Sequence, residues 1–208
     1  MPYLALIGTA TLVHLLALIS PGPDFIMAVR NSLVYSRKTG LWTAVGFGLG
    51  IAVHIFYCLA GLAVIISKSI LIFNTIKFLG AGYLIYIGLK SFYTKSAKLD
   101  VGEYKPRTYI SAISAIKTGF LTNVLNPKAT LFFLSLFTFV ISPTTPFVIM
   151  LIIGGIMITN TILWFSFVAL ILSHKRVRQI FEKFQNVFNR TFGGLLIVLG
   201  IKIAMTEK

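Results

Sequence analysis

Five residues interrupt the first apolar segment of the chain in a way that an unbroken membrane helix cannot accommodate. They are Ser20, Pro21, Gly22, Pro23 and Asp24. Each proline lacks an amide hydrogen and its ring collides with the preceding turn, so carbonyl groups in that turn lose their hydrogen-bond partners. In lipid, such groups must be satisfied by neighbouring helices or by water in a cavity. We therefore expect a discontinuous first helix whose break is buried in protein and carries Asp24.

The composition places the chain among polytopic membrane proteins. Of its 208 residues, 57% are hydrophobic and 12% are charged, and the mean hydropathy is +0.90. This apolar content exceeds what a soluble core of that size requires. The net charge of +14 could indicate nucleic acid, but the bases lie in short loops between apolar segments. An anionic lipid bilayer explains them, so we expect a single transmembrane domain over residues 1–208 and no nucleic-acid partner.

The apolar segments predict an all-α fold with six transmembrane helices, over residues 3–35, 41–66, 70–92, 109–141, 147–172 and 192–205. A membrane span needs about 20 residues. The first and fourth segments contain 33 residues each. As straight helices they would reach roughly 50 Å, whereas the hydrocarbon core is about 30 Å thick. Because Pro127 interrupts the fourth segment as Pro21 interrupts the first, we expect both helices to be broken.

The two halves of the sequence align as internal repeats. Shifting the second half back by 106 positions places Asn126 on Ser20, Pro127 on Pro21 and Asn160 on His54. We interpret this as repeats over about residues 3–93 and 109–206, joined by a cytoplasmic linker over about residues 94–108. Three helices per repeat force the halves into opposite orientations, the inverted-repeat plan of many secondary transporters. A chance match between apolar sequences is the alternative.

The basic residues predict the orientation of the chain in the membrane. They concentrate in the odd-numbered loops, and few lie at the termini or in the even-numbered loops. The positive-inside rule therefore places the odd loops in the cytoplasm and both termini outside. The residues that carry this prediction are Arg37, Lys38, Lys90, Lys95, Lys98, Lys105, Arg107, Lys175, Arg176, Arg178, Lys183 and Arg190.

Three motifs resemble the LysE/RhtB family. They are residues 20–24, the run GFLTNVLNPKA at residues 119–129, and Gly82-Tyr83-Leu84 followed by Gly88. The resemblance covers essentially the whole chain. It implies a multi-pass exporter in the bacterial inner membrane, coupled to the proton gradient, for amino acids or derivatives such as lysine, threonine, homoserine or homoserine lactone. It does not imply which of these is carried, because relatives with the same motifs handle different molecules.

The residues themselves suggest how a zwitterion could be held near the middle of the bilayer. The half-helix that begins after Asn126 and Pro127 presents unsatisfied N–H groups and a positive dipole end, which suit a carboxylate, and Lys128 could reinforce them. Asp24 would hold the ammonium group or, without substrate, a proton. Competition between the two for one carboxylate would give antiport.

Each of these residues also has a structural alternative. Asp24 could cap the helix that follows Pro23 or lie at the cytoplasmic interface. Lys128 could extend to a lipid headgroup. Asn123 and Asn126 could cap broken helix ends, although a cap that lines a cavity can do both.

Polar residues within two other segments are further candidates. His54 is a candidate proton carrier because it is a titratable group near the middle of a span. His54 and Asn160 could instead only bond to neighbouring helices. Gly46 and Gly50 form a small-xxx-small pair that favours close helix packing, or alternatively a homodimer contact.

Two other classes of function receive less support from the sequence. An exporter of an inorganic cation could use the same broken helices, but the apolar segments offer one carboxylate and no cysteine cluster, too few ligands for a typical metal path. A membrane enzyme would need a catalytic constellation of histidines and carboxylates, which we do not find. We therefore expect no enzymatic activity, no cofactor and no metal site.

Overall fold

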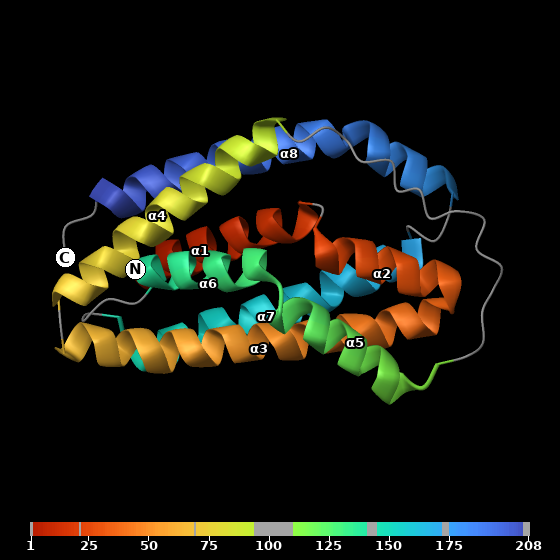
Figure 1. Cartoon of the computed structure of the whole chain (residues 1–208), viewed down its shortest axis with the longest axis horizontal. Coiled ribbons are helices and arrows are strands. Elements are labelled where there is room, and N and C mark those ends of the chain that lie inside the picture. The colour runs from red at the N-terminus through yellow and green to blue at the C-terminus, as the bar shows by residue number, and fades with distance from the viewer. Residues whose placement is uncertain are drawn as a thin grey trace.

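The computed structural model describes residues 2–20, 22–68, 70–93, 110–140, 145–171 and 175–205. Within these residues the chain forms eight helices and no strand, which confirms the all-α prediction. The helices lie along a common long axis (Figure 1). They are α1 (Pro2–Ile19), α2 (Pro23–Val34), α3 (Arg37–Lys68), α4 (Ile70–Tyr93), α5 (Ala112–Val124), α6 (Pro127–Val140), α7 (Phe147–Ile171) and α8 (Lys175–Met205).

The first and fourth apolar segments are each broken into two helices, as predicted. The axes of α1 and α2 differ by 55°, and those of α5 and α6 by 60°. At both breaks a proline begins the second helix, since its missing amide hydrogen and fixed φ are tolerated in a first turn. Gly22 is the N-cap of α2 in an extended conformation. Pro21, the other proline of the predicted break, lies outside the described residues.

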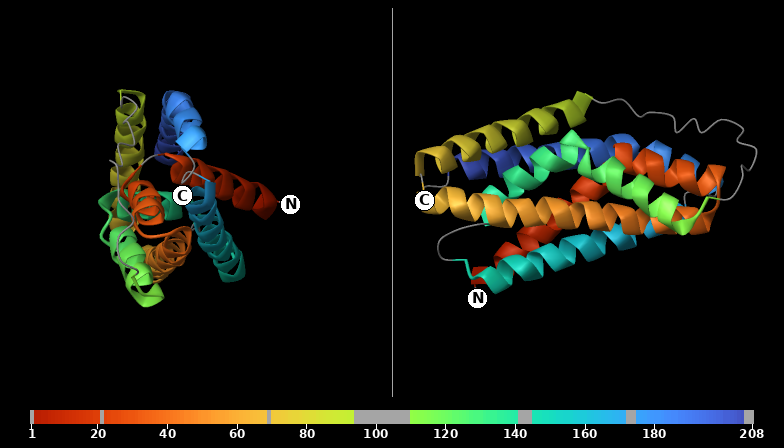
Figure 2. Two further views of the ribbon diagram at one scale, coloured as in Figure 1. Left: turned by 90° about the vertical axis from the view of Figure 1, so that its right-hand side faces the viewer. Right: turned by 60° about the horizontal axis from the view of Figure 1, so that its bottom comes forward.

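The number of membrane spans is only partly settled by the helices. Among the described residues, α3 and α7 are each long and apolar enough to cross a membrane, and each bent pair also qualifies if it is counted as one span. The six-span count and the inverted orientation of the repeats therefore stay predictions. The start of α1 and the end of α8 lie at the same end of the molecule (Figures 1 and 2). The predicted linker at residues 94–108 lies outside the described residues.

The last helix corrects the sequence-based segment at residues 192–205. Helix α8 begins at Lys175, so Lys175, Arg176, Arg178, Lys183 and Arg190 belong to a helix and not to a loop. The reason is that the apolar residues of this highly charged stretch repeat with the period of a helix. Apolar residues recur at positions 177, 180, 181, 184, 187 and 188, a spacing that places them on one helix face.

Two helix pairs approach so closely that glycine is required at the crossing. A Cβ on Gly46 of α3 would collide with the Ile116 carbonyl oxygen of α5, and one on Gly119 would collide with the Thr43 carbonyl oxygen. A Cβ on Gly88 of α4 would lie 2.7 Å from the Gly193 oxygen of α8. Side by side, α4 and α8 form one edge of the molecule (Figure 2). The close-packing prediction for Gly46 is therefore confirmed within one chain.

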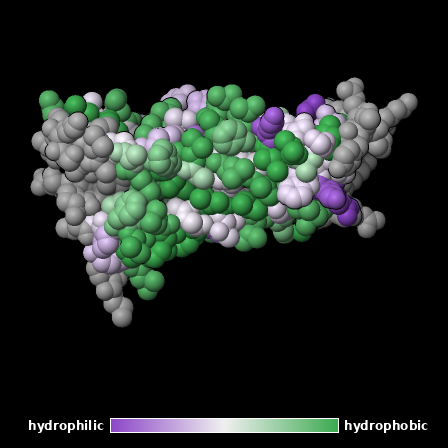
Figure 3. All heavy atoms as spheres, turned by 90° about the horizontal axis from the view of Figure 1, so that it is seen from below, coloured by the Kyte–Doolittle hydropathy of each residue, from purple (hydrophilic) through white to green (hydrophobic). Residues whose placement is uncertain are grey.

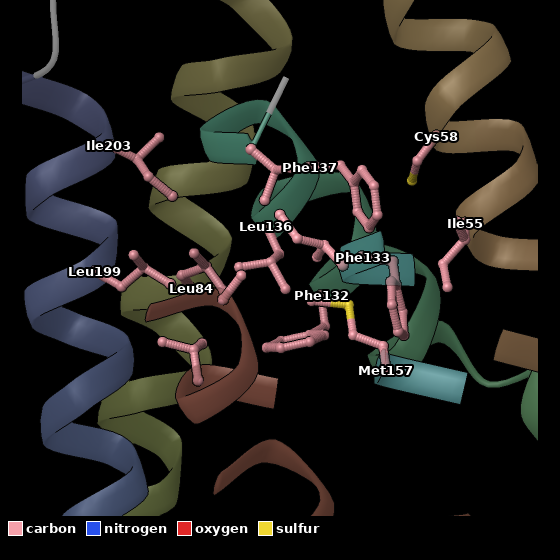
Figure 4. Packing of buried hydrophobic residues seen from close by; sticks show 14 of the residues in the cluster. Ile55, Cys58, Leu84, Phe132, Phe133, Leu136, Phe137, Met157, Leu199 and Ile203 are labelled. Atoms are coloured by element: carbon pink, nitrogen blue, oxygen red, sulfur yellow. The ribbon is translucent and has the colours of Figure 1, made fainter. Parts of the chain in front are cut away.

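Helix α6 lies at the centre of the larger apolar core. Phe133, Leu136 and Phe137 are at most 2% exposed and pack among residues of α3, α4, α7 and α8 (Figure 4). The outer surface is also apolar. Phe56 and Leu71, for example, are 72% and 73% exposed. Apolar residues gather over the middle of the face shown in Figure 3, as expected where lipid replaces water as the surrounding solvent.

Candidate functional site

The two helix breaks contact each other through polar side chains. Asn123, in the last turn of α5, donates its Nδ2 hydrogen to Asp24 Oδ2 at 2.7 Å. Asn126 donates its Nδ2 hydrogen to Asp24 Oδ1 at 3.3 Å. Lys128, in the first turn of α6, donates from Nζ to the Ser20 hydroxyl at 3.1 Å and the Ser20 carbonyl oxygen at 3.4 Å. Chain segments about a hundred residues apart thus form one site.

Asp24 is placed by the geometry of the α2 start. Gly22 is the N-cap and Pro23 the first helical residue, so Asp24 is the second residue of the helix and does not occupy the N-cap position considered as its structural alternative. Its carboxylate lies at the positive end of the α2 dipole, where a negative charge is stabilised. Because both carboxylate oxygens accept hydrogen bonds from asparagine amides of the second break, Asp24 faces that break and is only partly exposed.

Asn126 both caps a helix and contacts Asp24. Its Oδ1 accepts a hydrogen bond from the backbone N–H of Lys128 at 3.0 Å, which caps α6. Its Nδ2 donates to Asp24, as described above. Asn126 thus caps a broken helix end and lines the cavity, and its side chain is 6% exposed. Its contact with a substrate stays a prediction.

Asn123 connects the site to α3. Its backbone carbonyl accepts from the Asn126 N–H at 3.0 Å and contacts His54 Nε2 at 3.2 Å. Its side chain packs on Gly50, where an added Cβ would lie 2.5 Å from Asn123 Oδ1. Gly50 thus leaves the space in which the Asn123 amide can turn toward Asp24.

His54 and Tyr57 form a second layer behind Asn123. Since the Asn123 carbonyl can only accept, His54 Nε2 is the donor in that bond. His54 Nδ1 lies 2.7 Å from the Tyr57 hydroxyl, which is also 3.5 Å from the Thr130 carbonyl oxygen of α6. Tyr57 has one hydroxyl hydrogen. It goes to His54 when the imidazole is neutral, and it is free for Thr130 only when His54 carries a second proton.

A small cavity of about 50 Å³ lies at the meeting point of the breaks. By the usual requirement of about 10–15 Å³ per water molecule, it has room for a few waters. Ser20, Asp24, Asn123, Asn126 and Lys128 supply its polar lining, and the remaining lining is mainly apolar. The apolar and aromatic residues are Ala17, Leu18, Phe25, Ile51, Ala129, Phe132, Phe133 and Phe165, with His14 and Gly22 completing the wall.

The predicted candidate residues differ in how they relate to the cavity. Ser20, Gly22, Asp24, Asn123, Asn126 and Lys128 line the cavity, whereas His54 touches it only through Asn123. Asn160 of α7 does not line it. Pro23 and Pro127 shape the backbone on either side. In the described parts of the chain, no group of three or more histidine, cysteine, aspartate or glutamate side chains is arranged to hold a metal ion.

The candidate residues predicted from the sequence included neither His14 nor Tyr57. His14 is 1% exposed and lines the cavity from α1. A titratable residue within an apolar segment was the available signal. Tyr57 lies one turn after His54, at the spacing where side chains of a helix meet, and that spacing could have suggested the pair.

A helical chain whose apolar helices are broken around a shared cluster of polar side chains has the architecture of a membrane translocator. The chain belongs to the LysE type translocator family, whose model matches residues 15–207. The resemblance suggested by the motifs at residues 20–24 and 119–129 is thus confirmed.

The family relatives include efflux proteins. The chain is 33% identical over 195 residues to the uncharacterized membrane protein YrhP of Bacillus subtilis (90% of this chain, 93% of that protein). It is 29% identical over 206 residues to the threonine efflux protein of Escherichia coli (98% and 100%). It is 34% identical over 127 residues to a leucine efflux protein of Salmonella choleraesuis (61% and 58%). No solved structure matches the chain.

Proposed function

We propose that the protein exports an amino acid or a closely related derivative across the cytoplasmic membrane. The observation that carries the proposal is the pairing of one carboxylate, Asp24, with one ammonium group, that of Lys128, on opposite sides of the two helix breaks. An amino acid presents the complementary pair of charges. The names of the threonine and leucine efflux relatives support the same class of substrate.

Each end of the substrate has a partner in the cavity. The substrate ammonium would take the place of the asparagine amides at Asp24, whose two oxygens already accept two hydrogen bonds. The substrate carboxylate would bind Lys128 at the start of α6, where the helix dipole adds positive potential. The aromatic and aliphatic wall from α1, α6 and α7 would face the substrate side chain.

Proton antiport fits the same residues. Asp24 carries the only carboxylate in an apolar segment of the sequence, so a proton and a substrate ammonium would compete for it. His54 offers a second proton-binding group, because its protonation would change which partner receives the Tyr57 hydrogen. Loading from the cytoplasm would then alternate with proton entry from outside.

The test is an efflux panel in cells that express the protein. Cells loaded with single dipeptides release individual amino acids, and the proposal expects faster export of at least one amino acid than in cells carrying the empty vector. Equal rates for every amino acid tested, with the protein present in the membrane, would contradict it. Faster release of a divalent metal ion instead would favour the cation-exporter alternative.

The Asp24→Asn variant tests the site itself. Asparagine keeps the size of the side chain and one acceptor oxygen but removes the charge that binds the ammonium. Since a hydrogen bond to a charged group contributes about 1.5–3 kcal/mol, export should fall at least about tenfold. Asp24→Glu, which retains the charge, is the matched control and should retain more export. Normal export by Asp24→Asn at equal membrane abundance would remove this carboxylate from the mechanism.

A further inference from the structure

Four buried polar atoms lie on two facing helices, α1 and α7, and have no hydrogen-bond partner among the residues that the structure describes. They are Thr11 Oγ1, His14 Nδ1, Asn160 Nδ2 and Trp164 Nε1. A buried polar group without a partner costs about 1–3 kcal/mol. Such groups rarely occur in native proteins without a reason, so four of them along one helix contact call for an explanation.

The four atoms lie at neighbouring levels of the bundle. His14 Nε2 is 3.5 Å from Thr161 Oγ1, and this contact joins α1 to α7. Thr11 precedes His14 by three residues on α1, and Asn160 and Trp164 are within three residues of Thr161 on α7. We refer to the residues Thr11, His14, Asn160, Thr161 and Trp164, among which the contact of His14 with Thr161 joins the two helices, as the α1–α7 seam.

His14 connects the seam to the cavity at the helix breaks. Thr161 donates its hydroxyl hydrogen to the Met157 carbonyl oxygen at 2.9 Å, so in the His14 contact Thr161 accepts and His14 Nε2 donates. Nδ1 of the neutral ring then carries a lone pair that seeks a donor. Because His14 also lines the cavity, the seam adjoins the cavity. From His14, Thr11 lies about one helical turn nearer the start of α1, whereas Trp164 packs with Leu18 and Phe25 on the other side.

Polar groups on the other side of the breaks are arranged differently. Asn31 Nδ2 donates to Thr43 Oγ1 at 3.0 Å, and Ser36 and Thr39 share a hydrogen bond of 2.9 Å. The glycine crossing of Gly46 and Gly119 holds the α3 and α5 backbones in direct contact there. The polar side chains on the side where α2 ends therefore have hydrogen-bond partners, whereas the four polar atoms of α1 and α7 have none among the described residues.

We infer that the α1–α7 seam is the outward half of the substrate route. When α1 and α7 separate, water and then the substrate reach Thr11, His14 and Asn160 and supply the partners that these side chains lack in the closed contact. The substrate passes from the cavity over His14, then between Thr11 and Asn160, to the face at which α1 begins. This inference rests on the proposed transport of a small polar molecule from the cavity.

Single cysteines can test the route, because Cys58 is the only cysteine of the sequence. In a Cys58→Ala background, Thr11→Cys and Asn160→Cys place a thiol in the seam. Leu12→Cys and Leu163→Cys place one on the outer surface of the same two helices, where the leucines are 54% and 63% exposed. A membrane-impermeant, positively charged methanethiosulfonate reagent is applied to intact cells and, separately, to inside-out vesicles.

The inference expects both seam cysteines to react at least five times faster than both surface cysteines, from one face of the membrane only. Modification should stop export by the seam variants and leave export by the surface variants unchanged. Equal rates at all four positions, or reaction of the seam from both faces, would overturn the route. Export by the unmodified Cys58→Ala protein is measured in the same cells. If the parent protein, measured beside it, exports no amino acid, the proposed function itself fails, whatever the labelling shows.

Discussion

At the scale of single residues, Asn123 is the part of the site on which most other contacts depend. Its amide donates to Asp24, its carbonyl bonds to both Asn126 and His54, and its side chain lies in space left by Gly50. A small displacement of this one side chain would disturb the carboxylate, the cap of α6 and the His54–Tyr57 pair together.

The Gly50→Ala variant would displace the Asn123 side chain without replacing any polar side chain. The added Cβ would lie 2.5 Å from Asn123 Oδ1, 2.8 Å from its Cβ and 2.9 Å from its Cγ. Overpacking of this kind costs about 1–3 kcal/mol, so we expect efflux to fall several-fold. Gly61→Ala on the same helix is the matched control, because no described atom lies within 4 Å of its new Cβ. Equal efflux by the two variants would show that the position of Asn123 does not limit transport.

The sequence predicted those residues of the candidate site that are unusual, taken one at a time, within an apolar segment. Asp24, Asn126 and Lys128 stood out because charged and amide groups beside prolines are costly in apolar segments. His14 did not stand out, because the face of α1 that turns toward the cavity depends on how α1 packs on α6 and α7. Asn160 was aligned with His54, but the structure does not bring it to the cavity.

At the scale of helices, the break between α5 and α6 is maintained by Asn126 and Pro127 together. The residues just before the break still form helical bonds, as Leu125 N donates to Leu121 O at 3.1 Å. Proline at position 127 has no amide hydrogen, so the Asn123 carbonyl four residues earlier remains available to Asn126 N and His54. The break therefore creates the acceptor that His54 uses.

Pro127→Ala should weaken this arrangement. Alanine supplies an amide hydrogen that can donate to the Asn123 carbonyl and continue α5 into α6, which would draw that carbonyl away from His54. We expect efflux to fall several-fold while the variant remains as heat-stable in detergent as the parent. Pro146→Ala, before α7 and outside the cavity, is the control. A parent-like efflux rate for Pro127→Ala would mean that the Asn126 cap alone maintains the break.

The glycine crossing between α3 and α5 predicts an effect on stability. In Gly119→Ala the new Cβ meets the Thr43 carbonyl, a backbone atom that cannot move aside as a flexible side chain can. We expect the unfolding temperature in detergent to fall by several degrees, although alanine has the higher helix propensity by about 1 kcal/mol. Gly155→Ala of α7, with an open space around its Cβ among the described residues, should match or exceed the parent. A fall of equal size in both variants would contradict the close crossing.

The broken helices could be predicted because prolines act locally, whereas the start of α8 could not be predicted from hydropathy. Residues 175–191 are rich in basic side chains. Such a stretch does not meet the requirement of a membrane span for about 20 mainly apolar residues. Helix formation depends on the period of the apolar residues and not on their average, and that period runs through the whole of α8.

At the scale of the whole molecule, the start of α1 and the end of α8 lie at the same end of the bundle (Figure 1). The distribution of basic residues predicts that this end faces outward. Alkaline phosphatase fused after Lys208 should therefore be active, and green fluorescent protein fused there should be dark. The same reporters fused after Lys98, in the predicted cytoplasmic linker, should give the reverse. Phosphatase activity at Lys98 and not at Lys208 would invert the orientation.

The contact between Lys128 and Ser20 has a consequence for the proposed binding of a substrate. Through it, the Lys128 ammonium joins the start of α6 to the end of α1. If a substrate carboxylate binds Lys128 as proposed, the ammonium would leave Ser20. Substrate binding would then itself loosen the contact between the two broken helices.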